Sequence, residues 1–210
     1  MSEFLTVILA DGDFPVHPYP LSLLEQADKV VCCDGAALSL MKYGRVPDLI
    51  AGDLDSLPVL LRKNLGDKIV HFTEQESNDL SKAFRCCMER DWKNIVILGA
   101  TGKREDHTLG NLSLLAGYAE KAPGIRMVTD HGIFSVASGS CSFTCTPGQQ
   151  ISIIAIDPGA VVTAQGLKYP LDGLKLDMWW QGTLNEALSD SFSLDISPGC
   201  RLLVYHNLEK

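Results

Sequence analysis

Two carboxylates stand two residues apart where an apolar stretch ends, in the sequence LIAGDLDSL at residues 49–57. Asp53 follows Gly52 directly, and Asp55 comes two residues after Asp53. Because alternate residues of a strand face the same side, we expect the two side chains to converge beyond the strand end. Like charges at such short range repel each other unless a cation lies between them. The spacing therefore predicts a cation site at the end of this strand.

Other acids follow other strand candidates. Asp11 comes after TVILA, Asp34 comes after KVVCC, and Asp79 opens a helical segment. In an open parallel sheet, ligands bind beyond the carboxyl ends of the strands, so acids at that rim can form one site. Asp11 and Asp34 could instead cap the helices that follow them, and Asp79 could complement a helix dipole. One cap needs one acid, so capping explains the pair Asp53 and Asp55 poorly.

The segment GATGKREDH at residues 99–107 adds groups that suit a phosphate. A glycine-containing loop that opens a helix presents backbone N–H groups to an anion. Arg104 adds a forked donor for phosphate oxygens, and Asp106 could hold a cation or a substrate donor. The formal net charge is -8, so an anionic substrate would require a divalent metal. Together with the rim acids, the loop predicts a magnesium-bridged polyphosphate site.

The order of elements predicts two domains. Up to about residue 130, near-continuous apolar runs alternate with helical segments, which is typical of a buried, mostly parallel sheet. The clearest helix begins after its expected N-cap, Asn78, and a second, over about 107–120, is expected to bury Leu109. Later β-rich runs are separated by Pro-Gly pairs and predict an antiparallel sandwich or small barrel. We therefore expect an α/β domain over 1–130 and an all-β sandwich over 131–210.

Composition limits the class of protein. Of the 210 residues, 46% are hydrophobic, which suffices for an ordinary globular core. Lys and Arg are scattered, so no nucleic-acid partner is expected. The apolar run near the start is too short for a signal peptide or a membrane span, so we expect a cytoplasmic protein without a membrane partner. The seven cysteines show no CxxC metal spacing and are expected to be reduced and mostly buried.

These motifs, taken in order, resemble the thiamin pyrophosphokinase family. The matching segments are CCDGAA, PDLIAGDLDSL, ESND, GATGKREDHTLGNL and GLKYPL, followed by Asn185-Glu186. The resemblance covers nearly the whole chain, and GDLDS combined with GxxGxRxDHxLGN is a specific pair of motifs. It implies an N-terminal α/β domain, a C-terminal β-sandwich and a homodimer with active sites between subunits. The implied reaction transfers pyrophosphate from ATP to the hydroxyl of thiamin and releases AMP.

The resemblance also implies roles for single residues. The implied Mg²⁺ ligands are Asp53, Asp55 and Asp79. Asp34 is implied as a supporting acid near the metal and phosphates, and Arg104 and Asp106 as the pair at the transferred group and thiamin. The implied ATP contacts are Gly99, Thr101, Gly102, Lys103, Arg104, His107 and Asn111. The implied thiamin contacts are Asp106, Trp179, Trp180, Thr183 and Asn185.

The sequence departs from the family pattern at three positions. The family usually has a second Gly where Lys103 stands, a Thr where Asn78 stands, and a Ser where Leu184 stands. Lys103 could add a phosphate contact, and Asn78 can still cap its helix. Leu184 removes a hydroxyl that the family uses near thiamin, and Thr183 could take its place. Trp179 and Trp180 could stack on thiamin, or they could be core or dimer-interface aromatics.

Two other classes of protein stay open at this point. A strand that ends in DxD also opens the haloacid-dehalogenase phosphatases, in which the first Asp is a covalent nucleophile. That class would leave GATGKREDH and the sandwich unexplained. A non-catalytic regulator that binds thiamin or a nucleotide could keep the pocket without every metal carboxylate.

Overall fold

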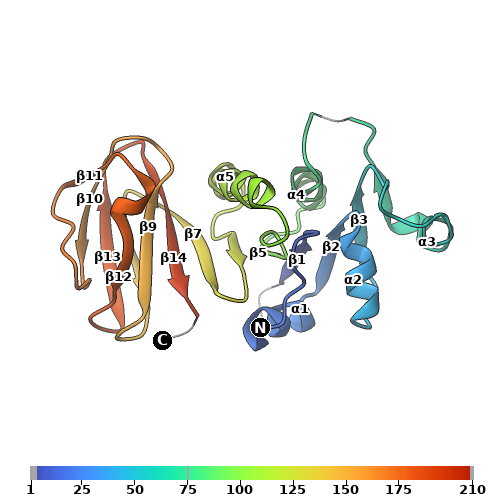
Figure 1. Ribbon diagram of the computed structural model, residues 1–210. Coiled ribbons are helices and arrows are strands. Elements are labelled where there is room, and N and C mark those ends of the chain that lie inside the picture. Colours follow the sequence, from blue (N-terminus) through green and yellow to red (C-terminus); the bar gives the residue numbers. More distant parts are fainter. Residues whose placement is uncertain (1–3, 75, 209–210) are drawn as a thin grey trace. The chain divides into compact units, whose positions relative to one another are not determined.

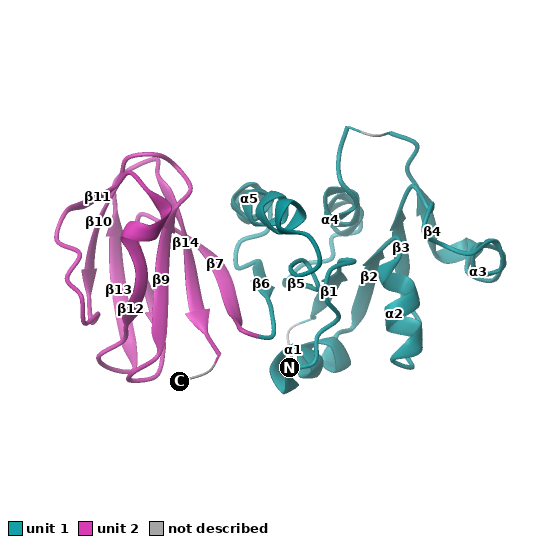
Figure 2. Cartoon of the chain, viewed as in Figure 1, with its two compact units in different colours: residues 1–130 teal, residues 131–210 magenta. Residues whose placement is uncertain are grey.

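The computed structural model describes residues 4–74 and 76–208 (Figure 1). The chain divides into two compact units, residues 1–130 and 131–210 (Figure 2). Within the described ranges, no helix is long and apolar enough to cross a membrane.

The first unit is built on parallel strands. They are β1 (Thr6–Leu9), β2 (Lys29–Cys33), β3 (Leu49–Gly52), β4 (Ile69–His71), β5 (Ile95–Leu98) and β6 (Arg126–Val128). Within this unit they lie in the order β6-β5-β1-β2-β3-β4, and each neighbouring pair is parallel. All residues of β1, β3 and β5 are buried. Strands covered on both faces carry continuous apolar runs, which explains the sequence pattern.

The helices of the first unit connect these strands. They are α1 (Pro18–Gln26), α2 (Ala36–Lys42), α3 (Val59–Asn64), α4 (Asp79–Glu89) and α5 (Glu105–Lys121), with a 3-10 turn at Gly66–Lys68. The predicted start of α4 is confirmed, because Asn78 Oδ1 accepts a hydrogen bond from the Ser81 N–H at 2.9 Å. The expected burial of Leu109 is wrong, since its side chain is 51% exposed. The first turns of α5 border an open cavity, and the buried residues come later in the helix.

The second unit consists of antiparallel strands. They are β7 (Gly132–Ser138), β8 (Ser140–Thr144), β9 (Gln150–Ala155), β10 (Ala160–Gln165), β11 (Leu174–Leu176), β12 (Gly182–Glu186), β13 (Ser191–Ile196) and β14 (Arg201–Asn207). One group is ordered β12-β9-β14-β7, and the other β11-β10-β13-β8. Both groups contribute to one buried apolar cluster, which includes Ile153 of β9 and Leu194 of β13. The prediction of an α/β part followed by a strand-rich part is confirmed.

The loops after β1 and β5 are joined by backbone hydrogen bonds. The Gly12 N–H donates to Gly99 O at 2.6 Å, and the Asp13 N–H donates to Thr101 O at 2.9 Å. A Cβ at Gly12 would lie 2.3 Å from Thr101 O and 2.5 Å from Gly99 O. Only glycine permits this approach, because both obstacles are backbone atoms. The pairing fixes the GATG loop at the rim of the sheet.

We therefore predict that Gly12→Ala lowers the free energy of unfolding by about 1–3 kcal/mol, since the added carbon forces the two loops apart. Urea unfolding followed by circular dichroism measures the change. Gly117→Ala is the matched control, because a Cβ there meets no atom within 4 Å. In the middle of α5 that alanine should raise stability by roughly 0.5–1 kcal/mol. Wild-type stability of Gly12→Ala would contradict the loop pairing.

Candidate active site

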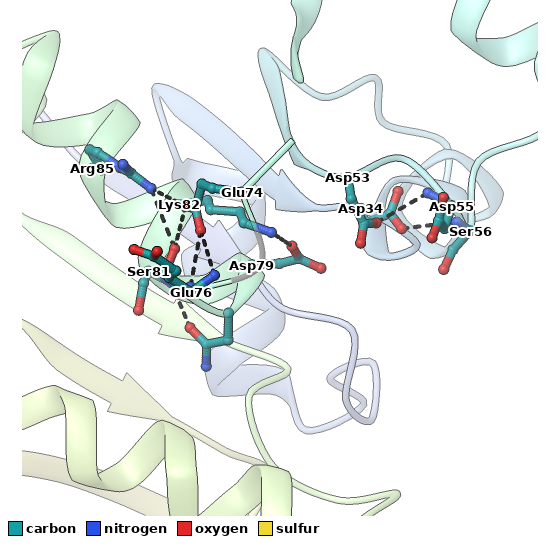
Figure 3. A network of polar contacts seen from close by, with 12 residues as sticks. Asp34, Asp53, Asp55, Ser56, Glu74, Glu76, Asp79, Ser81, Lys82 and Arg85 are labelled. Atoms are coloured by element: carbon teal, nitrogen blue, oxygen red, sulfur yellow. Dashed lines mark hydrogen bonds and ion pairs between the residues drawn. The ribbon is translucent and has the colours of Figure 1, made fainter. Parts of the chain in front are cut away.

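Three carboxylates meet at the carboxyl rim of the first unit. Asp34 follows β2, Asp53 follows β3, and Asp79 is the first residue of α4. One carboxylate oxygen from each lies within 4.8 Å of the others. Asp79 points from α4 toward Asp34 and Asp53 (Figure 3). The parallel order of β2 and β3 brings this about, because both strands end at the same edge.

Local backbone features make room for this cluster. A Cβ at Gly52 would lie 2.9 Å from Asp34 Cβ and 3.4 Å from Asp79 Oδ1, so glycine ends β3. Asp34 itself has a φ of +28°, a conformation that non-glycine residues rarely adopt. Such strain is typical of functional positions.

Asp34 has an unsatisfied oxygen. Its Oδ2 accepts a hydrogen bond from the Ser56 N–H at 3.0 Å. Its Oδ1 is buried and has no hydrogen-bond partner among the described residues. A buried carboxylate oxygen without a partner is costly, and a cation would satisfy it. Together with the oxygens of Asp53 and Asp79, it forms the all-oxygen donor set that Mg²⁺ or Ca²⁺ prefers.

Asp55 lies outside this group of three carboxylates. The strand alternation that would align it with Asp53 does not hold, because β3 ends at Gly52 and Leu54 has a φ of +70°. The Asp55 side chain is exposed, while its backbone N–H donates to Asp53 Oδ1 at 3.2 Å. Of the acids predicted at this rim, the structure therefore brings Asp34, Asp53 and Asp79 together.

Lys82 is a site residue that the sequence reasoning missed. Its Nζ donates to Asp79 Oδ1 at 3.1 Å, and its side chain is only 3% exposed. Burial raises the pKa of Asp79, and the contact with Lys82 opposes that rise. The spacing of Asp79 and Lys82 in the sequence could have indicated this contact, because residues three apart on a helix are neighbours and can form an ion pair.

A cavity of about 450 Å³ opens beside the carboxylates, within the first unit. Asp53 and Asp79 line it, and so do the predicted ATP contacts Gly102, Lys103, Arg104, His107 and Asn111. Gly99 and Thr101 are not among the residues that line the cavity. Their carbonyls accept the hydrogen bonds that join the two rim loops. The cavity therefore combines carboxylates with cationic and amide donors, as a site for a metal-bound polyphosphate requires.

Arg104 and Asp106 form an exposed ion pair. Arg104 Nε donates to Asp106 Oδ1 at 3.0 Å, and Nη2 donates to Oδ2. This hydrogen bonding lowers the pKa of Asp106 and raises that of Arg104. Both side chains are largely open to solvent. The carboxylate holds the guanidinium beside the cavity in an ordered, forked geometry.

Two departures from the family pattern now have a structural context. Lys103 has a φ of +56°, the left-handed region that favours glycine. Its Nζ donates to Asp11 O at 2.8 Å and to Asp11 Oδ1 at 3.2 Å. Asn78 caps α4 and also donates through Nδ2 to Asn111 Oδ1 at 3.2 Å. Asn111 in turn donates to Ala100 O at 2.9 Å, which ties both helices to the GATG loop.

The predicted thiamin contacts other than Asp106 lie in the second unit. Trp179 and Trp180 begin a 3-10 turn and are 54% and 70% exposed, so they are not core residues of this unit. Thr183 Oγ1 donates to Trp180 O at 2.7 Å. Asn185 is buried, and its amide accepts from the Tyr169 N–H and donates to Tyr169 O. It therefore fastens the GLKYPL segment to β12.

Leu184 stands between Thr183 and Asn185 on β12. Its side chain is 71% exposed and its φ is +58°. The pairing of β12 with β9 is irregular between Gly182 and Asn185. A leucine in a left-handed conformation is unusual, and the bulge directs it outward.

Comparison with known proteins identifies the family. The family model for the thiamin pyrophosphokinase catalytic domain matches residues 21–129, and the model for the thiamin pyrophosphokinase substrate-binding domain matches residues 132–205. The chain is 29% identical over 171 residues to thiamin pyrophosphokinase 1 of Caenorhabditis elegans, which covers 74% of this chain and 70% of that protein.

Solved structures agree with the family models. The thiamin pyrophosphokinase of Geobacillus thermodenitrificans has a TM-score of 0.79 and 26% identity, with 99% of each chain covered. That of Bacillus subtilis has a TM-score of 0.82 and 22% identity, with 98% of this chain and 100% of the other covered, and it shows the shared fold. The two family models together extend over almost the whole sequence. The chain belongs to the thiamin pyrophosphokinase family.

Proposed function

We propose that the chain transfers pyrophosphate from ATP to the hydroxyl of thiamin at the cluster of Asp34, Asp53 and Asp79. The products are thiamin diphosphate and AMP. The observation that carries the proposal is the meeting of three carboxylates beside a cavity that Lys103 and Arg104 also line. The family match supports this reaction, and neither a dehalogenase-like phosphatase nor a non-catalytic regulator is supported.

Asp34, Asp53 and Asp79 are the proposed holders of Mg²⁺, and the unsatisfied Oδ1 of Asp34 supports this choice. Asp55 is proposed as a further ligand, because its exposed side chain lies on the same turn as Asp53. Bound Mg²⁺ would supply positive charge that draws the phosphate oxygens and offsets their negative charge.

The residues of the loop and α5 are proposed to hold ATP. Pyrophosphate transfer breaks the bond between the β-phosphorus and the oxygen that stays on AMP, so positive charge is needed along the phosphates. Arg104 can bind two phosphate oxygens at once, while Lys103 acts as a point charge. His107, Asn111 and Gly102 line the same cavity. Gly99 and Thr101 contribute by fixing the loop.

The second unit is proposed to bind thiamin. Trp179 and Trp180 are exposed aromatic rings that can stack on the thiamin rings. Thr183 and Asn185 hold the surrounding backbone, and Asp106 is proposed to contact thiamin from the first unit. In this assignment residues 1–130 form the ATP- and metal-binding domain with its mostly parallel sheet. Residues 131–210 form the thiamin-binding sandwich.

The chain is further proposed to form a homodimer in the cytoplasm. Large apolar side chains are exposed on the second unit, including Met178, Leu184 and Leu188. A dimer interface that covered them would remove this apolar surface from water. Light scattering of the whole chain measures the assembly directly.

The reaction itself can be tested by its products. With ATP, Mg²⁺ and thiamin, we expect thiamin diphosphate and AMP in equal amounts, because a single transfer produces both. Chromatography of the nucleotides and of the thiamin esters measures the ratio. ADP as the main nucleotide product would contradict pyrophosphate transfer, and phosphate release without thiamin would indicate a phosphatase.

The metal carboxylates can be tested by amide substitution. Asp53→Asn and Asp55→Asn should each lower kcat by about 100-fold or more, since each removes charge from the cation site. Both variants should keep the wild-type Tm within a few degrees, because neither side chain is part of the apolar core. Asp67→Asn, an exposed acid on the 3-10 turn, is the control and should keep full activity.

Each outcome of this test has a defined meaning. Wild-type turnover of Asp55→Asn would show that Asp34, Asp53 and Asp79 suffice as protein ligands. A phosphorylated adduct trapped on Asp53 would instead indicate a covalent nucleophile and contradict the metal role.

Thiamin recognition can be tested at the two tryptophans. The double variant Trp179→Ala/Trp180→Ala should raise the KM for thiamin roughly 5- to 100-fold, because each aromatic contact contributes about 0.5–1.5 kcal/mol. The KM for ATP should stay unchanged. Val161→Ala, an exposed apolar residue on β10, is the control and should alter neither constant. An unchanged KM for thiamin in the double variant would remove the tryptophans from the thiamin site.

A further inference from the structure

Lys82 is a charged side chain that is almost fully buried at the wall of the cavity in the first unit. It lies on α4, where Leu80, Ala83 and Phe84 are also buried, and its own side chain is 3% exposed. A buried ammonium group is strongly disfavoured unless an opposite charge accompanies it. Packing alone therefore does not explain a lysine at this position.

The partner of this ammonium group is Asp79. Within the described part of the chain, Lys82 Nζ has one hydrogen-bond acceptor, Asp79 Oδ1, at 3.1 Å (Figure 3). The same oxygen lies 3.4 Å from the place that a Cβ on Gly52 would take. Asp79 is thus packed against the end of β3 and tied to a fixed charge on its own helix. Both contacts set the direction in which its carboxylate faces the cluster.

Without a metal ion, the negative charges of the cluster outnumber the positive ones. Asp34, Asp53 and Asp79 carry three negative charges when ionised, and Lys82 carries one positive charge. Two negative charges are left, which a single divalent cation balances. In a partly desolvated site, repulsion at such short distances is strong. A built-in cation therefore lowers the cost of keeping the three acids together.

We propose that Lys82 is a positioning residue of this site. Its buried ammonium holds Asp79 in place and offsets part of the repulsion among the three carboxylates before a divalent cation binds. The role toward the cation rests on the proposed function, whereas the contact with Asp79 rests on the structure alone. Lys82 needs no contact with ATP or thiamin to act in this way.

Thermal unfolding of the whole chain in EDTA and in Mg²⁺ tests the proposal. Lys82→Met removes the charge and keeps an unbranched side chain. In EDTA its Tm should fall by roughly 10 °C, because the half-buried carboxylate of Asp79 loses its partner inside the cluster. Mg²⁺ should restore at least half of that loss, so the variant gains more from Mg²⁺ than the wild type does. An equal loss in both buffers would show a packing role only and would overturn the proposal.

Lys93→Met is the matched control. Lys93 pairs with Asp91 at 2.9 Å, but both side chains are largely exposed. Exposed ion pairs contribute little to stability. The Tm of Lys93→Met should therefore differ from the wild-type Tm by less than about 2 °C in either buffer.

A double variant keeps the test decisive if Lys82→Met does not fold. Asp79→Asn/Lys82→Met removes both charges, so in EDTA it should be more stable than Lys82→Met alone. If the Tm of the double variant in EDTA falls by the sum of the falls for Asp79→Asn and for Lys82→Met, the proposal is overturned. If Mg²⁺ does not raise the wild-type Tm, the metal role in the proposed function is wrong. The EDTA comparison still decides whether Lys82 positions Asp79.

Discussion

The repulsion among three neighbouring carboxylates is the constraint on which the candidate site depends. Asp34, Asp53 and Asp79 place oxygens within 4.8 Å of one another, an arrangement that ionised acids avoid unless positive charge is near. Several local features serve this one arrangement. Gly52 ends β3 without a Cβ, Asp34 takes an unusual backbone conformation, and the buried ammonium of Lys82 contacts Asp79. Each costs stability when considered alone, and each is explained by the site that it supports.

The sequence predicted the elements well because their causes are local. Buried strands show as continuous apolar runs, and Asn78 before an apolar stripe marks the start of α4. The expected convergence of Asp53 and Asp55 along one strand face was wrong, because it depended on where β3 stops. The strand ends at Gly52 and Leu54 turns into the left-handed region, so Asp53 and Asp55 do not share a strand face. No pattern in the sequence indicates the exact residue at which this strand ends.

Contacts between segments far apart in the sequence set the places of other residues. Asp34 lies in the cluster, as expected for an acid at this rim, because the neighbouring strands β2 and β3 end at the same edge. Leu109 fits the helical pattern, yet it is exposed, and the buried residues of α5 come later in the helix. Asn111 looks like a ligand contact in the sequence, and the structure shows that it also links Asn78 to the GATG loop.

Two of the three departures from the family pattern lie at positions of unusual backbone conformation. Lys103 and Leu184 both have positive φ, in positions where the family usually has a small residue. A larger side chain in that conformation is strained, so a compensating contact is expected. Lys103 has one, because its ammonium binds the backbone and carboxylate of Asp11 on the neighbouring rim loop. Leu184 has a backbone contact, since its N–H donates to Ser152 Oγ at 3.1 Å, but its side chain is left in solvent. The first departure is therefore stabilised within the rim that holds the carboxylates, whereas the second places an apolar side chain at the surface beside the residues proposed to bind thiamin.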